Sequence, residues 1–179
     1  MKNFLLAIFS LFMIAILSSC GQQLTPFSQR MVDEHNWSES DLQKVQFYLS
    51  ENIVLRRDIG GEDSRIKDGK IKVVDGRKVE EVRFEKGTPG VMIFTPKSKL
   101  YAISFDSSDD KYLMFGPSKK QRGKYVLKAK DWNKNYGKVS YNGKIYTTPA
   151  SSAFSSLLVD IKKAKKVSYK SQTAKGRKI

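Results

Sequence analysis

Cysteine and histidine are scarce in this 179-residue chain, which has one residue of each. One Cys excludes an intramolecular disulfide framework and a cysteine-based zinc site. One His excludes a histidine-rich metal centre and argues against histidine-dependent catalysis. The chain also has no glycine-rich phosphate loop and no G-x-S-x-G or H-E-x-x-H motif, so no familiar enzyme class is indicated. Hydrophobic residues make up 40% of the chain and aromatic residues 11%, which is enough to bury the core of one domain.

The first twenty residues have the pattern of a secretory leader. Lys2 precedes an apolar run from Phe4 to Leu17, which ends in Ser18-Ser19-Cys20. As a helix, a run of this length rises about 1.5 Å per residue and falls short of the roughly 30 Å needed to cross a bilayer. A positively charged start, a short apolar stretch and small residues at its end predict a signal peptide over residues 1–19.

The end of this leader, Leu17-Ser18-Ser19-Cys20, resembles the lipobox of bacterial lipoproteins, in which an aliphatic residue and two small residues precede the Cys. The resemblance implies that residues 1–19 are removed and that acyl chains such as palmitate are attached at Cys20. Two or three acyl chains hold a protein stably in a membrane. Gly21, rather than Asp, follows Cys20, which in Gram-negative lipoproteins implies the outer membrane. The alternatives are an ordinary cleaved signal with a chance Cys, and an uncleaved anchor.

Three further regions follow the predicted signal peptide. Residues 20–36 carry several polar side chains and are expected to form a lipidated tether that spaces the domain from the bilayer. His35 lies in this tether and is expected to be exposed. Residues 37–172 are expected to form a β-rich domain, and residues 173–179 a basic, frayed C-terminal tail.

The periodicity of residues 37–172 predicts one short helix followed by many strands. Ser38 or Ser40 can cap a helix, and apolar residues at 42, 45 and 49 form one stripe, so a helix is expected over residues 39–50. Asp75-Gly76 and Asn142-Gly143 are two-residue hairpin signals. Strands are expected over residues 53–55, 70–74, 78–85, 91–95, 100–105, 112–115, 124–130, 138–141 and 144–147. The predicted fold is mainly β, a small antiparallel barrel or sandwich with one short N-terminal helix.

Two segments carry additional interpretations. Residues 154–161 fit both a helical face and a strand face, and we favour two strands, the second over residues 165–170. Residues 42–50, leading to residues 53–57, look similar to segments of uncharacterised Gram-negative envelope lipoproteins. That resemblance implies no activity and no site residue.

Positive charge is concentrated in the C-terminal part of the chain. Residues 21–116 contain 15 Lys and Arg against 16 Asp and Glu, whereas residues 117–179 contain 17 against 2. On a strand over 124–130, the side chains of Lys124, Lys128 and Lys130 would share one face. The candidate basic surface comprises Lys119, Lys120, Arg122, Lys124, Lys128, Lys130, Lys162, Lys163, Lys165 and Lys166.

Several anionic partners could use this surface. The predicted anchor places it near a membrane, so anionic lipid headgroups are the nearest partner, and an acidic envelope protein or an anionic polymer comes next. Aromatic residues lie among the basic ones, as in single-strand binders, but nucleic acid is not expected as a partner of a secreted lipoprotein. A solvated face that serves only solubility is the alternative.

The acidic residues give weak candidates for chemistry. Asp106, Asp109 and Asp110 lie close in sequence but lack the spacing of a calcium loop, so a solvated turn is expected, and no metal. Glu80 and Glu81 are adjacent, so on a strand they point to opposite faces and cannot form an acid–base pair. Apart from the covalent lipid on Cys20, no cofactor is expected.

The predicted function is a lipid-anchored, non-catalytic cell-envelope protein that acts as a binding or assembly module through its basic C-terminal half. The alternatives are an electrostatic binder of anionic lipid or polymer, and a carboxylate-dependent hydrolase.

Overall fold

A computed structural model describes residues 23–59, 70–74 and 77–167. The predicted fold class is confirmed, because the chain is mainly β and forms two antiparallel sheets that are not closed, consistent with a sandwich. Three short α-helices, rather than one, accompany the strands of the described residues. The predicted signal peptide, Cys20, the Asp75-Gly76 turn and the C-terminal tail lie outside the described residues.

The larger sheet has seven strands, and its two edges approach each other. Its order is β1 (Leu24–Pro26), β13 (Leu157–Asp160), β2 (Gln46–Leu49), β6 (Pro89–Lys97), β7 (Leu100–Ser104), β8 (Tyr112–Ser118) and β9 (Lys124–Leu127). Beyond β1, the Phe27 carbonyl accepts a hydrogen bond from the Tyr125 amide of β9, at 3.0 Å. An isolated bridge joins Ser28 to Lys124. The sheet therefore curls around the side chains on its inner face without a continuous closing ladder.

The smaller sheet has six strands and contains both predicted hairpins. Its order is β10 (Asp131–Trp132), β11 (Tyr136–Tyr141), β12 (Lys144–Pro149), β3 (Ile53–Asp58), β5 (Arg77–Phe84) and β4 (Lys70–Val74). The β4–β5 pairing and the β11–β12 pairing confirm the two hairpins. Asn142 and Gly143 have φ of 48° and 68°. These positive values suit the tight turn that matches the twist of two antiparallel strands, and they explain why Asn-Gly stands there.

The core lies mainly against the seven-stranded sheet and is strongly aromatic. Phe27 is fully buried, and its ring centroid lies 4.9 Å from that of Tyr125 and 5.1 Å from that of Phe47. Tyr101 stacks on Tyr125 with a centroid separation of 4.7 Å. Burial of aromatic side chains of this size supplies much of the free energy of folding in a small domain.

The predicted helix over residues 39–50 is wrong beyond its first turn. The helix α3 covers only Glu39–Leu42, although it begins as predicted, with a reciprocal capping box between Ser38 and Asp41. The chain then enters β2, where Phe47 and Leu49 are fully buried at every second position. β2 pairs with β13 on one edge and with β6 on the other. These two ladders to distant segments override the local helical stripe.

The predicted tether is also wrong for the part that the structure describes. Instead of a spacer up to residue 36, β1 joins the sheet, and the helix α2 (Gln29–His35) follows, capped by the Ser28 hydroxyl. His35 is half-buried rather than exposed, and its ring lies 5.0 Å from that of Trp37. The folded domain therefore begins no later than Leu24, because the apolar side chain of Phe27 holds this segment in the core.

The C-terminal segment divides between a strand and a helix. The favoured strand is confirmed in β13, but the described part of residues 165–170 belongs to a helix, α4 (Ile161–Val167), and not to a second strand. The Asp160 carboxylate accepts hydrogen bonds from the Lys162 and Lys163 amides at 3.0 and 3.2 Å, which caps the start of α4. Among the described residues, no helix has the length and apolar character to span a bilayer.

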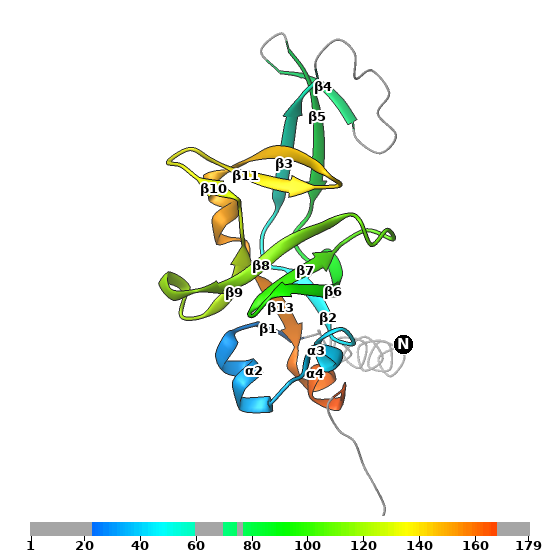
Figure 1. The fold of residues 1–179 in the computed structure, drawn as a ribbon, viewed down its shortest axis with the longest axis vertical. Coiled ribbons are helices and arrows are strands. Elements are labelled where there is room, and N and C mark those ends of the chain that lie inside the picture. The colour runs from blue at the N-terminus through cyan, green and yellow to red at the C-terminus, as the bar shows by residue number, and fades with distance from the viewer. Residues whose placement is uncertain (1–22, 60–69, 75–76, 168–179) are drawn as a thin grey trace, which may run out of the picture.

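Figure 1 shows how the elements are distributed along the longest axis of the molecule. The helices α2, α3 and α4 gather at one end, close to β1 and β13. The hairpin of β4 and β5 lies at the opposite end, and β11 crosses between the two. The molecule thus has a helical end and a hairpin end, with the junction of the two sheets between them.

Candidate functional site

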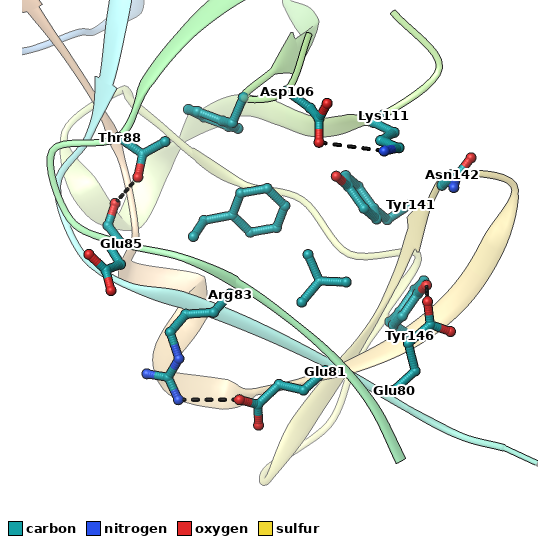
Figure 2. A pocket seen from close by; sticks show the side chains of 13 residues that line it. Glu80, Glu81, Arg83, Glu85, Thr88, Asp106, Lys111, Tyr141, Asn142 and Tyr146 are labelled. Carbon is teal, nitrogen blue, oxygen red and sulfur yellow. Dashed lines mark hydrogen bonds and ion pairs between the residues drawn. The ribbon is translucent and has the colours of Figure 1, made fainter. Parts of the chain in front are cut away.

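A cavity lies where the two sheets meet, and we refer to it as the inter-sheet cleft. It encloses about 550 Å³. Residues of β5, of the chain between β7 and β8, and of the β11–β12 hairpin line it. Figure 2 shows Asp106 and Lys111 on one side of the cleft, with Glu81, Arg83, Glu80 and Tyr146 across from them.

Aromatic rings form the apolar lining of the inter-sheet cleft. Phe84, at the end of β5, lies edge-on to Tyr141 with a centroid distance of 5.4 Å and lies 5.8 Å from Phe105. Gly90 makes room for the Phe105 ring, because a Cβ at Gly90 would lie 2.5 Å from it. Phe105 also contacts Phe115 of the core at 6.0 Å. The lining is therefore continuous with the core of the seven-stranded sheet, which holds the rings in place.

Two buried carboxylates from β5 stand at the other side of the cleft, and each has an arginine opposite it on β3. Glu80 pairs in register with Arg57, whose Nε and Nη2 donate to Oε2 at 3.1 and 2.9 Å. Glu81 pairs in register with Arg56, whose Nε donates to Oε2 at 2.9 Å. Arg83 adds a longer contact of 3.4 Å to Glu81. The charge of both buried carboxylates is thus compensated by the protein itself, as burial of an ion requires.

Tyr146 completes the arrangement around Glu80. Its hydroxyl donates a hydrogen bond of 2.9 Å to Oε1 of Glu80. Burial, followed by this hydrogen bond to the carboxylate, raises the pKa of Tyr146 to about 12. The phenol is therefore protonated at physiological pH and acts as a donor to Glu80.

The acidic turn behaves as a solvated loop at the rim of the cleft. Asp106 forms an ion pair of 3.6 Å with Lys111, and both line the cleft. Asp110 is fully exposed, and a hydrogen bond from the Ser108 hydroxyl lowers the pKa of its carboxyl. Within the described residues, no cluster of three His, Cys, Asp or Glu side chains could hold a metal ion.

The ten residues of the candidate basic surface lie on two separate parts of the molecule. Lys119, Lys120, Arg122, Lys124, Lys128 and Lys130 follow the turn between β8 and β9 and the segment after it. Lys162, Lys163, Lys165 and Lys166 belong to α4 at the helical end (Figure 1). The structure therefore does not bring all ten residues together on one face.

Lys128 departs from the predicted face of exposed lysines. The strand β9 ends at Leu127, before Lys128, and Val126 is buried together with its neighbours Tyr125 and Leu127. The Lys128 ammonium donates to the Pro117 carbonyl at 3.0 Å, and its partial burial lowers its pKa. The predicted alternation fails because β9 is buried on both faces.

The aromatic residues of the inter-sheet cleft were not identified from the sequence. Tyr141 and Tyr146 flank the predicted Asn142-Gly143 turn, so the hairpin signal places them near each other. No feature of the neighbouring sequence predicts that they lie beside β5 and the end of β7. That placement depends on the pairing of β12 with β3 through Thr147 and Arg56, which are 91 positions apart. Such long-range pairing has no local signature.

No protein-family model matches this chain, and neither a curated protein nor a solved structure matches it.

Proposed function

We propose that this protein is a lipid-anchored, non-catalytic lipoprotein of the cell envelope, which binds a partner protein in its inter-sheet cleft. Cys20 would attach it to a membrane, the outer membrane of a Gram-negative bacterium. The single observation that supports binding over catalysis is that each buried carboxylate of the cleft faces an arginine. An acid–base hydrolase needs one carboxyl group that holds a proton and another that accepts one from water or substrate.

The size and lining of the cleft suit a binding site. Ligand sites usually enclose roughly 300–1,000 Å³, with apolar walls and a few polar groups that fix orientation. The inter-sheet cleft has rings of Phe84, Phe105 and Tyr141 beside polar and charged groups at its rim. Such a lining suits an apolar side chain of a partner, with a neighbouring charge at the rim.

The experiment for the cleft is a pull-down of the lipoprotein from detergent extracts, comparing two matched charge reversals. Glu85→Arg changes an exposed residue that lines the cleft, and Glu51→Arg makes the same change at an exposed residue outside its lining. We expect a partner that is retained in moderate salt with the wild type and with Glu51→Arg, and that is lost with Glu85→Arg. Equal retention with all three proteins would show that the partner binds elsewhere.

The experiment for the anchor is Cys20→Ser, with mass spectrometry of the mature N-terminus. We expect the wild type to begin at an acylated Cys20 and the variant to be unprocessed or released from membranes. A mature N-terminus without acyl mass, together with unchanged membrane retention, would contradict the anchor.

A second candidate function is electrostatic binding of an anionic lipid or polymer, which the excess of 17 basic over 2 acidic residues after position 116 favours. Such binding should weaken steeply with salt, because the screening length falls from about 10 Å at 0.1 M to about 3 Å at 1 M. A partner protein held in the cleft should dissociate far less under the same change.

A further inference from the structure

The first residue of β1 lies beside the start of α4. In the antiparallel pair of β1 and β13, Leu24 stands opposite Asp160, and α4 begins at the next residue, Ile161. Leu24 is four residues after Cys20 in the sequence. An extended chain spans at most about 3.6 Å per residue, so four residues reach roughly 14 Å. A lipid on Cys20 would therefore hold α4 within about one or two screening lengths of the membrane surface.

α4 turns its charged side chains outward. Ala164 is buried and Ile161 is half-buried, whereas Lys162, Lys163, Lys165 and Lys166 are exposed. The Asp160 carboxylate is largely buried and caps the first turn of the helix. The outer surface of α4 thus presents four ammonium groups over about two helical turns.

Lys44 extends this cationic surface. Lys44, from the turn between α3 and β2, lines a small hollow of about 190 Å³ together with Asp160 and Lys163 of the α4 region. We refer to Lys44, Lys162, Lys163, Lys165 and Lys166 as the α4 patch. Exposed Lys and Arg residues close to an anionic membrane are attracted to it, and the attraction of several residues accumulates.

Acidic residues on the neighbouring helices are occupied by partners of their own. Asp33 accepts a hydrogen bond from Gln29, Glu34 pairs with Arg30, and Asp41 belongs to the capping box of α3. Glu34 is paired with a cation, whereas the hydrogen bonds of Asp33 and Asp41 leave their negative charges in place, and Glu39 adds another. These charges repel an anionic membrane and offset part of the attraction of the five ammonium groups.

From this register and charge distribution we infer that the α4 patch contacts anionic lipid headgroups and orients the domain on the membrane. The inference rests on the proposed anchor at Cys20. It separates the two basic groups by their distance along the chain from Cys20. The turn between β8 and β9 meets the N-terminal segment at Ser28 and Gln29, eight and nine residues after Cys20, whereas α4 begins beside Leu24, four residues after Cys20. In this orientation the helical end faces the bilayer, and the β4–β5 hairpin points away from it (Figure 1).

The experiment measures the reactivity of individual lysines in the lipoprotein reconstituted into vesicles. The vesicles contain phosphatidylcholine alone or phosphatidylcholine with phosphatidylglycerol, and a membrane-impermeant amine reagent is followed by mass spectrometry. We expect the α4 patch to react about fivefold more slowly on the anionic vesicles, the ratio that an attraction of about 1 kcal/mol per lysine gives. Lys119, Lys120 and Lys124 should react equally on both, and high salt should remove the protection.

Two variants that each remove four positive charges provide the control. One replaces the four α4 lysines with Gln, and the other replaces Lys119, Lys120, Arg122 and Lys124 with Gln; thermal melts confirm that both fold. Protection of Lys44 should disappear in the first variant and persist in the second. Equal reactivity of the α4 patch on both vesicles, or protection of Lys119, Lys120 and Lys124 instead, would overturn the inference. If Cys20 carries its acyl mass in that sample, the anchor stands and only the orientation fails; a bare Cys20 overturns both.

Discussion

The two sheets of this protein bury different kinds of side chain. The inner face of the seven-stranded sheet is filled by apolar and aromatic groups, with Phe27, Phe47, Phe115 and Tyr125 all fully buried. The six-stranded sheet also buries apolar groups such as Ile53 and Leu55, but in addition it buries two carboxylates, Glu80 and Glu81, opposite arginines of the adjacent strand. One sheet is therefore held by apolar burial, and the other depends in part on compensated charge.

This difference bears on where a binding site can form. Ion pairs of buried carboxylates need every partner in place, because removal of one leaves an uncompensated charge. Apolar packing at the density of a protein interior leaves little space for a ligand. The inter-sheet cleft lies where the two sheets meet: Phe105 follows β7 of the seven-stranded sheet, whereas Phe84, Tyr141 and the two paired carboxylates come from the six-stranded sheet. We interpret the seven-stranded sheet, with its aromatic core, as a rigid scaffold that supports the more polar six-stranded sheet.

The largest expected effect on the free energy of unfolding comes from a substitution in the aromatic core of the seven-stranded sheet. Phe27→Ala should lower the free energy of unfolding by about 3–5 kcal/mol, because it opens a cavity among the rings of Phe47, Tyr101 and Tyr125. Denaturant unfolding of the variant measures this, with Phe154→Ala as the control, since Phe154 is 67% exposed. A loss similar to that of the control would mean that the segment around Phe27 is the loose tether that its composition suggested.

The next largest effect on the free energy of unfolding comes from a buried carboxylate of the six-stranded sheet. Glu80→Ala should cost about 3 kcal/mol, because it leaves Arg57 and the Tyr146 hydroxyl without their buried acceptor. The matched control is Glu34→Ala, which removes an exposed pair with Arg30 and should cost at most about 1 kcal/mol. Urea unfolding of both variants makes the comparison. If the two losses were equal, the ion pairs of β5 would be no more important than surface pairs, and the contrast between the sheets would not hold.

The features that could be predicted from the sequence are those specified by neighbouring residues. Asn142-Gly143 predicts its hairpin because the turn itself requires positive φ, and Ser38 predicts the start of α3 because a cap acts within one turn. The alternation of apolar residues predicts most strands, and these together predict a mainly β fold.

The features that were missed depend on contacts between distant residues. Residues 46–49 form a strand because β13, more than one hundred positions away, pairs with them. Phe27 falls within the predicted polar tether, and its burial could not be predicted, because it depends on rings from β2, β7 and β9. The inter-sheet cleft was missed for the same reason, since β5, the β7–β8 connection and the β11–β12 hairpin meet only in the folded chain.

The smallest expected effect comes from the hydrogen bond between Tyr146 and Glu80, and its dependence on pH tests the contrast between the two sheets. Tyr146→Phe should cost about 1 kcal/mol near neutral pH, since one hydrogen bond to Glu80 is lost. In the wild type, the pKa of Tyr146 is raised from 10.0 in the unfolded chain to about 12 in the fold. The protonated Tyr146 therefore contributes its full stabilisation of the fold below pH 10. This contribution is lost as the pH rises from 10 to 12, because over that range the unfolded chain binds fewer protons than the folded chain. The gap in unfolding free energy between wild type and Tyr146→Phe should therefore narrow over that interval. The difference between the two proteins removes the titration of lysines and of the other tyrosines. If the gap stays constant from pH 9 to 12, the pKa of Tyr146 is not raised in the fold. The hydrogen bond between Tyr146 and Glu80 would then stabilise the six-stranded sheet less than its geometry indicates.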